Sequence, residues 1–255
     1  MITKREVPIL EFDDERDALI RARSEREEPL PERCVIAFFG NEVRERAARE
    51  GWPLLQMMRS EVVELPIYGC EVEGEAVCVA IPFCGGPGAA VTLEELRAMG
   101  CRKFIACGGA GSLVPGQKLG ALMLPTAAVR DEGTSYHYLP PAREVACGEA
   151  ALRATREGLR AMGVPFVEGK TWTSDAIYRE TPERIALRRE EGCLTVEMEA
   201  AALFAVSAFY DLTLAQILYA GDDVSGEEWD ERGWNRQRSV RENLLDLSLR
   251  LARRL

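Results

Sequence analysis

From residue 34 onward, short apolar runs alternate with amphipathic segments of helical length, and this alternation restricts the fold more than any other feature of the chain. The apolar runs are bounded by glycine or proline and contain many β-branched residues, as buried strands do. The expected strands are 34–39, 76–82, 103–107, 120–124, 169–173 and 213–220. The expected helices are 41–50, 89–99, 148–162, 182–190, 199–209 and 235–254. Strands that alternate with helices predict an α/β fold.

The first 31 residues differ from the remainder of the chain. Residues 13–28 are almost all charged or helix-forming, and Pro29 and Pro31 end the stretch. We expect a charged arm or a surface helix over 1–31, which either contacts a neighbouring subunit or is a solvated leader without a role. No internal repeat or linker rich in serine and proline interrupts the remainder, so 32–255 is expected to form a single domain.

Composition excludes several classes of function. Lys and Arg number 32 against 42 Asp and Glu, which gives a net charge of -10 and no basic face for a nucleic acid. The longest apolar runs, 34–39 and 200–208, are far shorter than the roughly 20 residues of a membrane helix. Residues 1–10 contain no apolar signal sequence. We expect a cytoplasmic protein that binds neither nucleic acid nor a membrane.

Cysteine and histidine usage argues against a metal site. No two of the eight cysteines form a CxxC pair, and His137 is the only histidine. Most of the cysteines lie in apolar stretches, where a free thiol behaves as a small hydrophobic group. We therefore expect buried, reduced thiols and no bound metal. The cysteines are Cys34, Cys70, Cys78, Cys84, Cys101, Cys107, Cys147 and Cys193.

Glycine-bearing turns follow three of the expected strands. Gly40 precedes a helix with Arg44 one turn into it, an arrangement that can hold an anion, although a surface arginine is the simpler interpretation. Residues 84–88 (CGGPG) and 107–113 (CGGAGSL) follow the next two strands, where α/β proteins commonly bind ligands. Neither is a Walker loop or a GxGxxG motif, and both are also compatible with tight turns that need a positive φ.

Two acidic segments occur where strands are expected to end. Residues 195–201 (TVEMEAA) place Glu197 and Glu199 on either side of Met198, where a carboxylate can accept hydrogen bonds from vicinal hydroxyls and methionine can contact a sugar ring. Acids favoured by the dipole at a helix N-terminus are the alternative. Asp222 follows the strand 213–220 and is a candidate general acid, or part of an ordinary polar turn.

The order of these motifs resembles the nucleoside phosphorylase superfamily, which includes uridine phosphorylases, hexameric purine nucleoside phosphorylases and methylthioadenosine nucleosidases. The resemblance extends from residue 34 to the carboxyl terminus, and VEMEAAA followed by Asp222 about 23 residues later is its most specific element. Residues 129–138 (VRDEGTSYHY) also resemble a segment of uridine phosphorylases. The resemblance implies a three-layer α/β/α fold with a mixed, partly barrel-like central sheet.

The resemblance also implies the residues that bind the nucleoside. Glu199 would bind the 2′- and 3′-hydroxyls of ribose, Met198 would pack against the sugar, and Glu197 would shape the pocket. Ile177 and Tyr178 would lie beside the base, in a segment where relatives carry an aromatic residue.

The remaining implied roles concern the leaving base and the phosphate. Asp222 matches the acid with which purine-cleaving members protonate N7 of the base, which makes it a catalytic candidate together with Glu199. Gly40, Arg44 and Gly109 match positions of the phosphate site.

Several positions depart from the phosphorylase pattern. Ala106 stands where phosphorylases carry a phosphate-binding arginine, and Gly109 stands where they carry serine or threonine. Arg59 is a loose match to the arginine that a neighbouring subunit lends in hexamers. Nucleosidases lack the arginine at 106 and use water, which Glu45 could activate.

Recognition of uracil is not supported by the residues after the base-pocket segment. Uridine phosphorylases use a glutamine and an arginine there, whereas this chain has Thr181, Glu183 and Arg184. Asp222, which matches the acid of purine-cleaving members, favours a purine nucleoside as substrate instead.

Taken together, the motifs predict a nucleoside phosphorylase that cleaves a ribonucleoside, preferably a purine one, into free base and ribose 1-phosphate. The alternatives are a nucleosidase that uses water and a nucleoside-binding member without efficient turnover. Phosphate is expected as co-substrate, with no metal or organic cofactor, and the resemblance implies a homo-oligomer. His137 either faces a neighbour's pocket or is simply a satisfied polar residue.

Overall fold

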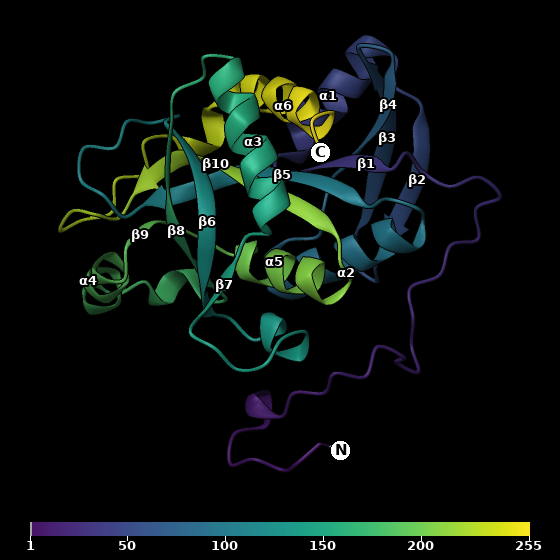
Figure 1. Cartoon of the computed structure of the whole chain (residues 1–255). Helices are drawn as coiled ribbons and strands as arrows, with labels where there is room; N and C mark the ends of the chain where they lie inside the picture. The colour runs from purple at the N-terminus through teal and green to yellow at the C-terminus, as the bar shows by residue number, and fades with distance from the viewer. Residues whose placement is uncertain (1) are drawn as a thin grey trace.

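A computed structural model describes residues 2–255, in which ten strands form one mixed sheet (Figure 1). Strands β10, β6, β8, β9 and β5 follow one another, and β5 also pairs with β10. This second pairing closes the five strands into a barrel, from which β1, β4, β3 and β2 extend as an open sheet. The strands are β1 (Arg33–Ala37), β2 (Leu54–Arg59), β3 (Glu64–Val72), β4 (Glu75–Ala80), β5 (Lys103–Ser112), β6 (Leu122–Asp131), β7 (Glu144–Ala146), β8 (Phe166–Ser174), β9 (Cys193–Glu197) and β10 (Thr213–Asp223).

Helices cover both faces of the sheet. α1, α3 and α6 lie on one face, α2 and α5 lie on the other, and α4 packs outside the barrel beside β9 (Figure 1). The expected α/β class, the three layers and the partly barrel-like sheet are thus confirmed. The α-helices are α1 (Gly40–Glu50), α2 (Gly85–Ala98), α3 (Glu149–Ala161), α4 (Pro182–Glu190), α5 (Ala200–Phe209) and α6 (Arg238–Ala252). The short 3-10 helices are η1 (Pro8–Leu10), η2 (Thr134–His137), η3 (Ile177–Arg179) and η4 (Trp234–Arg236).

The buried centre of the fold explains why α5 carries no charge. Eight consecutive residues of this helix, from Ala200 to Ser207, are buried, and its alanines allow close packing against α2. An entirely buried helix cannot leave the N–H groups of its first turn to water, so these donors need partners within the protein. Polar side chains just before α5 are therefore needed to accept hydrogen bonds from these N–H groups.

The second glycine-rich segment is part of a strand, which corrects the interpretation of 107–113 as a tight turn. β5 continues to Ser112, and none of the glycines within it has a positive φ. A Cβ on Gly108 would lie 3.2 Å from Cβ of Phe38, and one on Gly109 would lie 2.9 Å from Cζ of Tyr219. The glycines therefore make room for neighbouring aromatic side chains. The first segment does contain a turn, because Gly85 has φ +79°.

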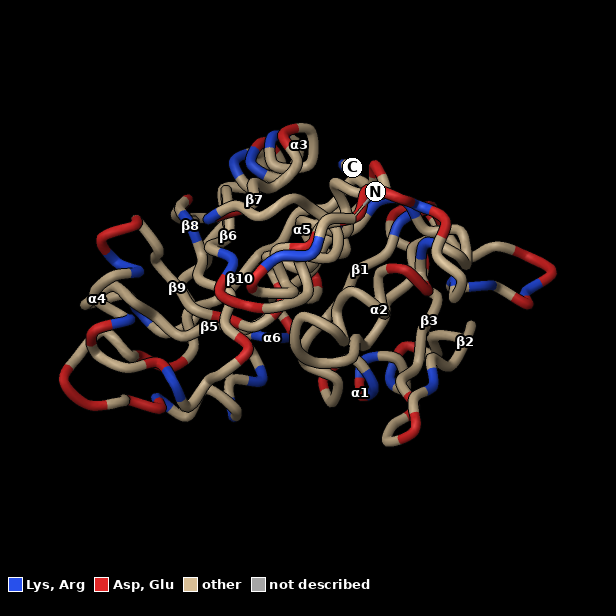
Figure 2. The backbone as a smooth tube through the Cα atoms, turned by 90° about the horizontal axis from the view of Figure 1, so that it is seen from below, with Lys and Arg blue, Asp and Glu red and all other residues tan. Residues whose placement is uncertain are grey.

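The amino-terminal residues form no helix between 13 and 28, so the helical alternative for this segment is wrong. The chain instead extends along the outside of the molecule, and only the three-residue η1 is helical in the described part of the arm (Figure 1). Acidic and basic residues alternate along it, as Figure 2 shows. Such a charged, extended segment has too little apolar surface to form a core of its own. The division into an arm and a single domain at residue 31 remains a prediction.

Candidate active site

A buried pair of carboxyl groups occupies the junction between β9 and α5. Glu197 ends the strand, and its Oε2 accepts hydrogen bonds from the backbone N–H groups of Glu199 (2.8 Å) and Ala200 (2.6 Å). These are donors that the buried start of α5 would otherwise leave unpaired. Oε1 of Glu197 is 2.6 Å from Oγ1 of Thr173 at the end of β8. The threonine Oγ1 in turn accepts the backbone N–H of Ala201 at 2.9 Å. The pair is therefore built into the strand–helix junction.

Burial decides the charge of this pair. Burial and the nearby charge of Glu199 raise the pKa of Glu197 to about 8, despite its hydrogen bonds from Thr173 and the backbone. Burial also raises the pKa of Glu199, which the hydrogen bond from Gly85 opposes. The two carboxyl groups titrate as a coupled pair. At neutral pH we assign the proton to Glu197 and the negative charge to Glu199.

Glu199 has one oxygen fixed and one free. Its Oε1 accepts the backbone N–H of Gly85 at 2.8 Å and lies 3.6 Å from Sγ of Cys84. Its Oε2 has no hydrogen-bond partner among residues 2–255. The residue itself is 8% exposed. A buried carboxylate held at one oxygen and open at the other is suited to accept hydrogen bonds from a bound hydroxyl pair. Met198 between the two acids is partly exposed.

A third acid closes the side of this site formed by α2. A Cβ on Gly86 would lie 3.0 Å from Oγ1 of Thr134 and 3.3 Å from Oε2 of Glu132, so only glycine fits there without displacing them. Glu132 is buried, and it accepts hydrogen bonds from both the backbone N–H (2.9 Å) and the hydroxyl of Ser135. The segment 129–138, which resembles uridine phosphorylases, thus contacts the glycine turn at the start of α2.

Asp222 lies near the end of β10, where this strand meets β5 and β9. A Cβ on Gly111 of β5 would lie 3.0 Å from Val196 of β9 and 3.4 Å from Oδ1 of Asp222, so the three strands meet there. The other oxygen, Oδ2, accepts a hydrogen bond of 2.7 Å from Nε1 of Trp229. Trp229 is carried by a closed turn, because Asp223 and Asp230 pair through their backbones.

Sequence reasoning missed two residues around Asp222. Trp229 is one, and the other is Glu180, whose pKa is raised to about 7 by burial and by the charge of Asp222. Neither belongs to a motif, and both lie in irregular segments whose path is set by distant contacts. A tryptophan within a polar stretch such as residues 225–237 was the one available signal for Trp229.

The three candidates for phosphate binding lie at the ends of β1 and β5. Arg44 folds back over Gly40, since a Cβ on that glycine would be 2.8 Å from Nη1 of the arginine. Gly109 is exposed, and the hydroxyl of Tyr219 lies 3.0 Å from the position that a Cβ of residue 109 would take. The tyrosine therefore fills the space of the serine or threonine found in phosphorylases. Ala106 is completely buried.

A second arginine lies beneath Gly109, but its charge is already paired. Nε of Arg241 donates to the hydroxyl of Tyr219 at 3.0 Å, and its Nη1 lies 3.0 Å from Oε1 of Glu42. The ion pair is largely buried, with side chains 13% and 10% exposed. Oε2 of Glu42 is buried without a hydrogen-bond partner in residues 2–255. Glu45, by contrast, is exposed and forms an ion pair with Arg238.

Other candidates do not join the site within this chain. Ile177 and Tyr178 lie in η3 and are 53% and 96% exposed. Arg59 is exposed on β2 and pairs with Glu64, and His137 is exposed in η2. Such positions can contribute to a pocket only through a neighbouring molecule or a movement of the chain.

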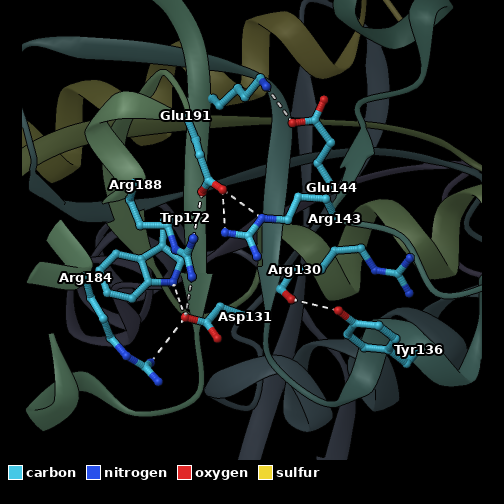
Figure 3. Close-up of polar contacts among 10 residues, drawn as sticks. Arg130, Asp131, Tyr136, Arg143, Glu144, Trp172, Arg184, Arg188 and Glu191 are labelled. Atoms are coloured by element: carbon cyan, nitrogen blue, oxygen red, sulfur yellow. Dashed lines mark hydrogen bonds and ion pairs between the residues drawn. The ribbon is translucent and has the colours of Figure 1, made fainter. Parts of the chain in front are cut away.

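Arg184 is directed to a polar cluster centred on Asp131 (Figure 3). Oδ2 of Asp131 accepts hydrogen bonds from Nη1 of Arg184 (3.3 Å), Nη2 of Arg188 (3.2 Å) and Nε1 of Trp172 (3.0 Å). The cluster ties α4 to β6 and β8. Arg184 is thus held by an ion pair with Asp131. Glu183 is exposed and Thr181 only partly buried.

A test of the carboxyl pair that needs no substrate is the replacement Glu197→Gln. Between pH about 4.5 and 8 the folded protein retains a proton on Glu197 that the unfolded chain has released, so stability falls as the pH rises. The slope from one such group is at most about 1.4 kcal/mol per pH unit. Glutamine mimics the protonated form, and we expect the decrease in Tm between pH 5 and 8 to be smaller in this variant. Parallel Tm–pH curves for E197Q, wild type and the exposed control E183Q would contradict the assignment.

Comparison with known proteins identifies the family. The model of the phosphorylase superfamily matches residues 32–252. The uridine phosphorylase of Salmonella typhimurium is 27% identical over 206 residues, which cover 75% of this chain and 81% of the relative. The guanosine phosphorylase of Halorubrum lacusprofundi is 27% identical over 174 residues, covering 66% and 72%. The solved structure of an AMP nucleosidase from Bacteroides thetaiotaomicron has a TM-score of 0.68 at 22% identity, covering 87% of each chain, and shows a shared fold.

No helix within residues 2–255 combines the length and the apolar character needed to cross a membrane. The resemblance drawn from the motif order is confirmed, because the family match spans most of the chain. The chain belongs to the phosphorylase superfamily.

Proposed function

We propose that this protein is a nucleoside phosphorylase that cleaves the N-glycosidic bond of a purine ribonucleoside to give the free base and ribose 1-phosphate. The observation that carries the proposal is the buried Glu199 carboxylate, held at Oε1 by Gly85 and free at Oε2, on the strand–helix junction between β9 and α5. The relatives include both a uridine and a guanosine phosphorylase, and Asp222 favours the purine.

The sugar end of the reaction depends on the carboxyl pair. Cleavage of the glycosidic bond develops positive charge on the ribose, which a buried carboxylate stabilises strongly because little water screens it. Glu199 would accept hydrogen bonds from the 2′- and 3′-hydroxyls and stabilise that charge. Glu197, protonated, holds the start of α5 without adding a second negative charge that would disturb its neighbour.

The base end of the reaction depends on Asp222. A purine leaves more readily when its N7 is protonated, and a positioned carboxylic acid can donate that proton. Glu180 lies close enough to Asp222 for the two charges to interact, and burial together with that charge raises the pKa of Glu180 to about 7. Two adjacent carboxyl groups can serve as proton donor to N7 and as acceptor for an N–H of the base.

Phosphate would bind between Gly40, Arg44 and Gly109. Arg44 supplies the positive charge and the start of α1 supplies N–H donors. Arg241 cannot take the place of the arginine missing at 106 without leaving Glu42 unpaired. We expect phosphate to bind more weakly than in relatives that carry that arginine.

A nucleosidase is the second candidate, and a specific observation favours it. Ala106 and the filled space beside Gly109 both weaken the phosphate site, and the fold is also that of an AMP nucleosidase. Glu45 is paired with Arg238 and is a poor candidate to activate water. Glu42 at the start of α1 is also paired, with Arg241, and its second oxygen is buried. A nucleoside-binding protein without turnover is the third possibility.

The experiment that separates these functions uses inosine, guanosine, adenosine, methylthioadenosine and uridine, each incubated with and without phosphate. Ribose 1-phosphate formed only with phosphate from the purine nucleosides is the expected result. Arg44→Ala should then raise the KM for phosphate at least about tenfold, because a charge-assisted contact is lost. Free ribose formed at the same rate without phosphate would establish a nucleosidase, and binding without release of base would establish the third function.

We further propose a cytoplasmic homo-oligomer that takes part in purine salvage. Arg59 is 72% exposed on β2 at the outer edge of the open sheet, so a neighbouring subunit can reach it. Light scattering after gel filtration measures the assembly directly. A catalytically competent monomer would remove Arg59 from the proposed site.

Trp229 is expected to position Asp222 for proton transfer. A hydrogen bond to a charged group is worth about 1.5–3 kcal/mol, and part of that is retained when water replaces the indole. Trp229→Phe should therefore lower kcat for inosine about tenfold and leave the KM for phosphate unchanged. In the wild type, the indole N–H resonance that disappears in W229F should shift when a nucleoside binds. Equal kcat in W229F and wild type would contradict the positioning role, and W52F is the matched control.

A further inference from the structure

Three buried thiols far from the carboxyl pair come together in the open half of the sheet. They are Cys34 of β1, Cys78 of β4 and Cys101 just before β5. Their sulfur atoms all lie within 4.8 Å of one another, and those of Cys78 and Cys101 are 3.6 Å apart. The nucleoside chemistry proposed above uses none of them.

The backbone fixes the positions of these sulfur atoms. Cys34 and Cys78 are directly paired in neighbouring parallel strands, so their side chains lie on the same face of the sheet. Cys101 is held by its N–H, which donates to the carbonyl of Leu96 at the end of α2. All three residues are completely buried. A donor set provided by three rigid elements loses little conformational entropy when it binds an ion.

We propose that Cys34, Cys78 and Cys101 form a binding site for a monovalent copper ion with three sulfur ligands. A metal–sulfur bond of about 2.3 Å in a planar, three-coordinate site requires sulfur–sulfur separations of about 4.0 Å. The observed 3.6 Å between Cys78 and Cys101 and the 4.8 Å limit for the whole set are compatible with that separation. Thiolates select soft ions such as copper(I) and zinc. Zinc prefers four ligands, and the cluster found among residues 2–255 offers three.

The surroundings suit an ion that arrives without water. The three thiols lie in the buried apolar core, which disfavours strongly hydrated ions such as magnesium and calcium. Arg102 follows Cys101, and its Nη1 donates to the carbonyl of Cys101 at 2.7 Å. This guanidinium lies beside the cluster and can offset part of the negative charge of bound thiolates. Binding releases thiol protons to water, so the affinity should rise with pH.

The end of the amino-terminal arm packs against the two residues that precede Cys101. The N–H of Leu30 donates to the carbonyl of Met99 at 2.8 Å, and a Cβ on Gly100 would lie 2.8 Å from Cβ of Pro29. Leu30 is 3% exposed, whereas most residues of the arm before it are exposed. Local release of this short segment is the route by which an ion would reach Cys101.

The test is an anaerobic titration of the full chain with copper(I) in competition with a bathocuproine chelator. One copper per chain is expected, together with a thiolate-to-copper absorption band and a higher Tm. Cys34→Ala, Cys78→Ala and Cys101→Ala should each weaken binding by more than the roughly 10–100-fold that loss of an outer-shell partner costs. The control variants are Cys84→Ala, an exposed thiol, and Cys193→Ala, a buried thiol outside the cluster.

X-ray absorption at the copper edge of the wild-type protein decides the matter even if a variant fails to fold. Three sulfur neighbours support the proposal. Copper that is bound equally well by the three cluster variants, or lost with C84A, would overturn it, as would the absence of binding in wild type. The three thiols would then be no more than small apolar side chains. Nucleoside cleavage should not change in the cluster variants, so this test is independent of the proposed function.

Discussion

Asparagine in place of Asp222 is expected to lower turnover of inosine or guanosine by about 10²–10⁴-fold, the range that general acid catalysis contributes. The amide cannot supply the proton that makes the purine a good leaving group. It still offers an oxygen to Nε1 of Trp229, so the turn that carries the indole should stay in place. Initial rates of base release at saturating nucleoside measure the loss as a change in kcat.

A substrate that needs no proton sharpens this test. In 7-methylguanosine the base already carries a positive charge, so D222N should cleave it within about tenfold of the wild-type rate. Asp211→Asn is the matched control, because Asp211 is exposed, remote and has φ +55°, a conformation that asparagine accepts. Equal losses on inosine and 7-methylguanosine would assign Asp222 a role other than proton donor. Wild-type turnover of inosine would remove it from the mechanism.

Hydrophobic periodicity predicted the elements that form the centre of the fold. The expected strands overlap β1, β4, β5, β6, β8 and β10. These strands are buried on one or both faces, so their apolar patterns are strong. α4 also begins and ends where expected, although it packs outside the barrel and buries only Arg188. β2, β3, β7 and β9 were missed because they are short or carry charged residues and proline. β3 and β2 lie at the outer edge of the open sheet, where one side is solvated.

The candidate site was predictable only where a motif lies on one continuous segment. Glu197 and Glu199 are two residues apart, and the buried start of α5 determines where both lie. The residues that surround the candidate phosphate site depend on pairs remote in the chain. Examples are Tyr219, which lies against Gly109, and Arg241, which pairs with Glu42. A single sequence contains no signal for such pairs. The three-thiol cluster could not be predicted for the same reason, because its members are spread over residues 34–101.

Glu199→Gln is expected to reduce kcat/KM for ribonucleosides by about 10²–10³-fold, the loss typical when a group that stabilises transition-state charge is removed. Glutamine keeps an oxygen that can accept the N–H of Gly85, so the start of α2 should be retained. What it lacks is the negative charge beside the ribose and the capacity to accept two hydroxyl donors at once. The comparison is best made with inosine and 2′-deoxyinosine in both proteins.

The deoxynucleoside separates the two parts of that loss. It has no 2′-hydroxyl, so the ratio of wild-type to E199Q activity should be smaller for 2′-deoxyinosine than for inosine, and the difference measures the coupling between Glu199 and that hydroxyl. Glu183→Gln, an exposed acid in the first turn of α4, controls for the loss of a carboxylate as such. A ratio that is the same for both substrates would show that Glu199 acts on the charge of the sugar alone. An unchanged kcat/KM for both substrates would remove it from the ribose site.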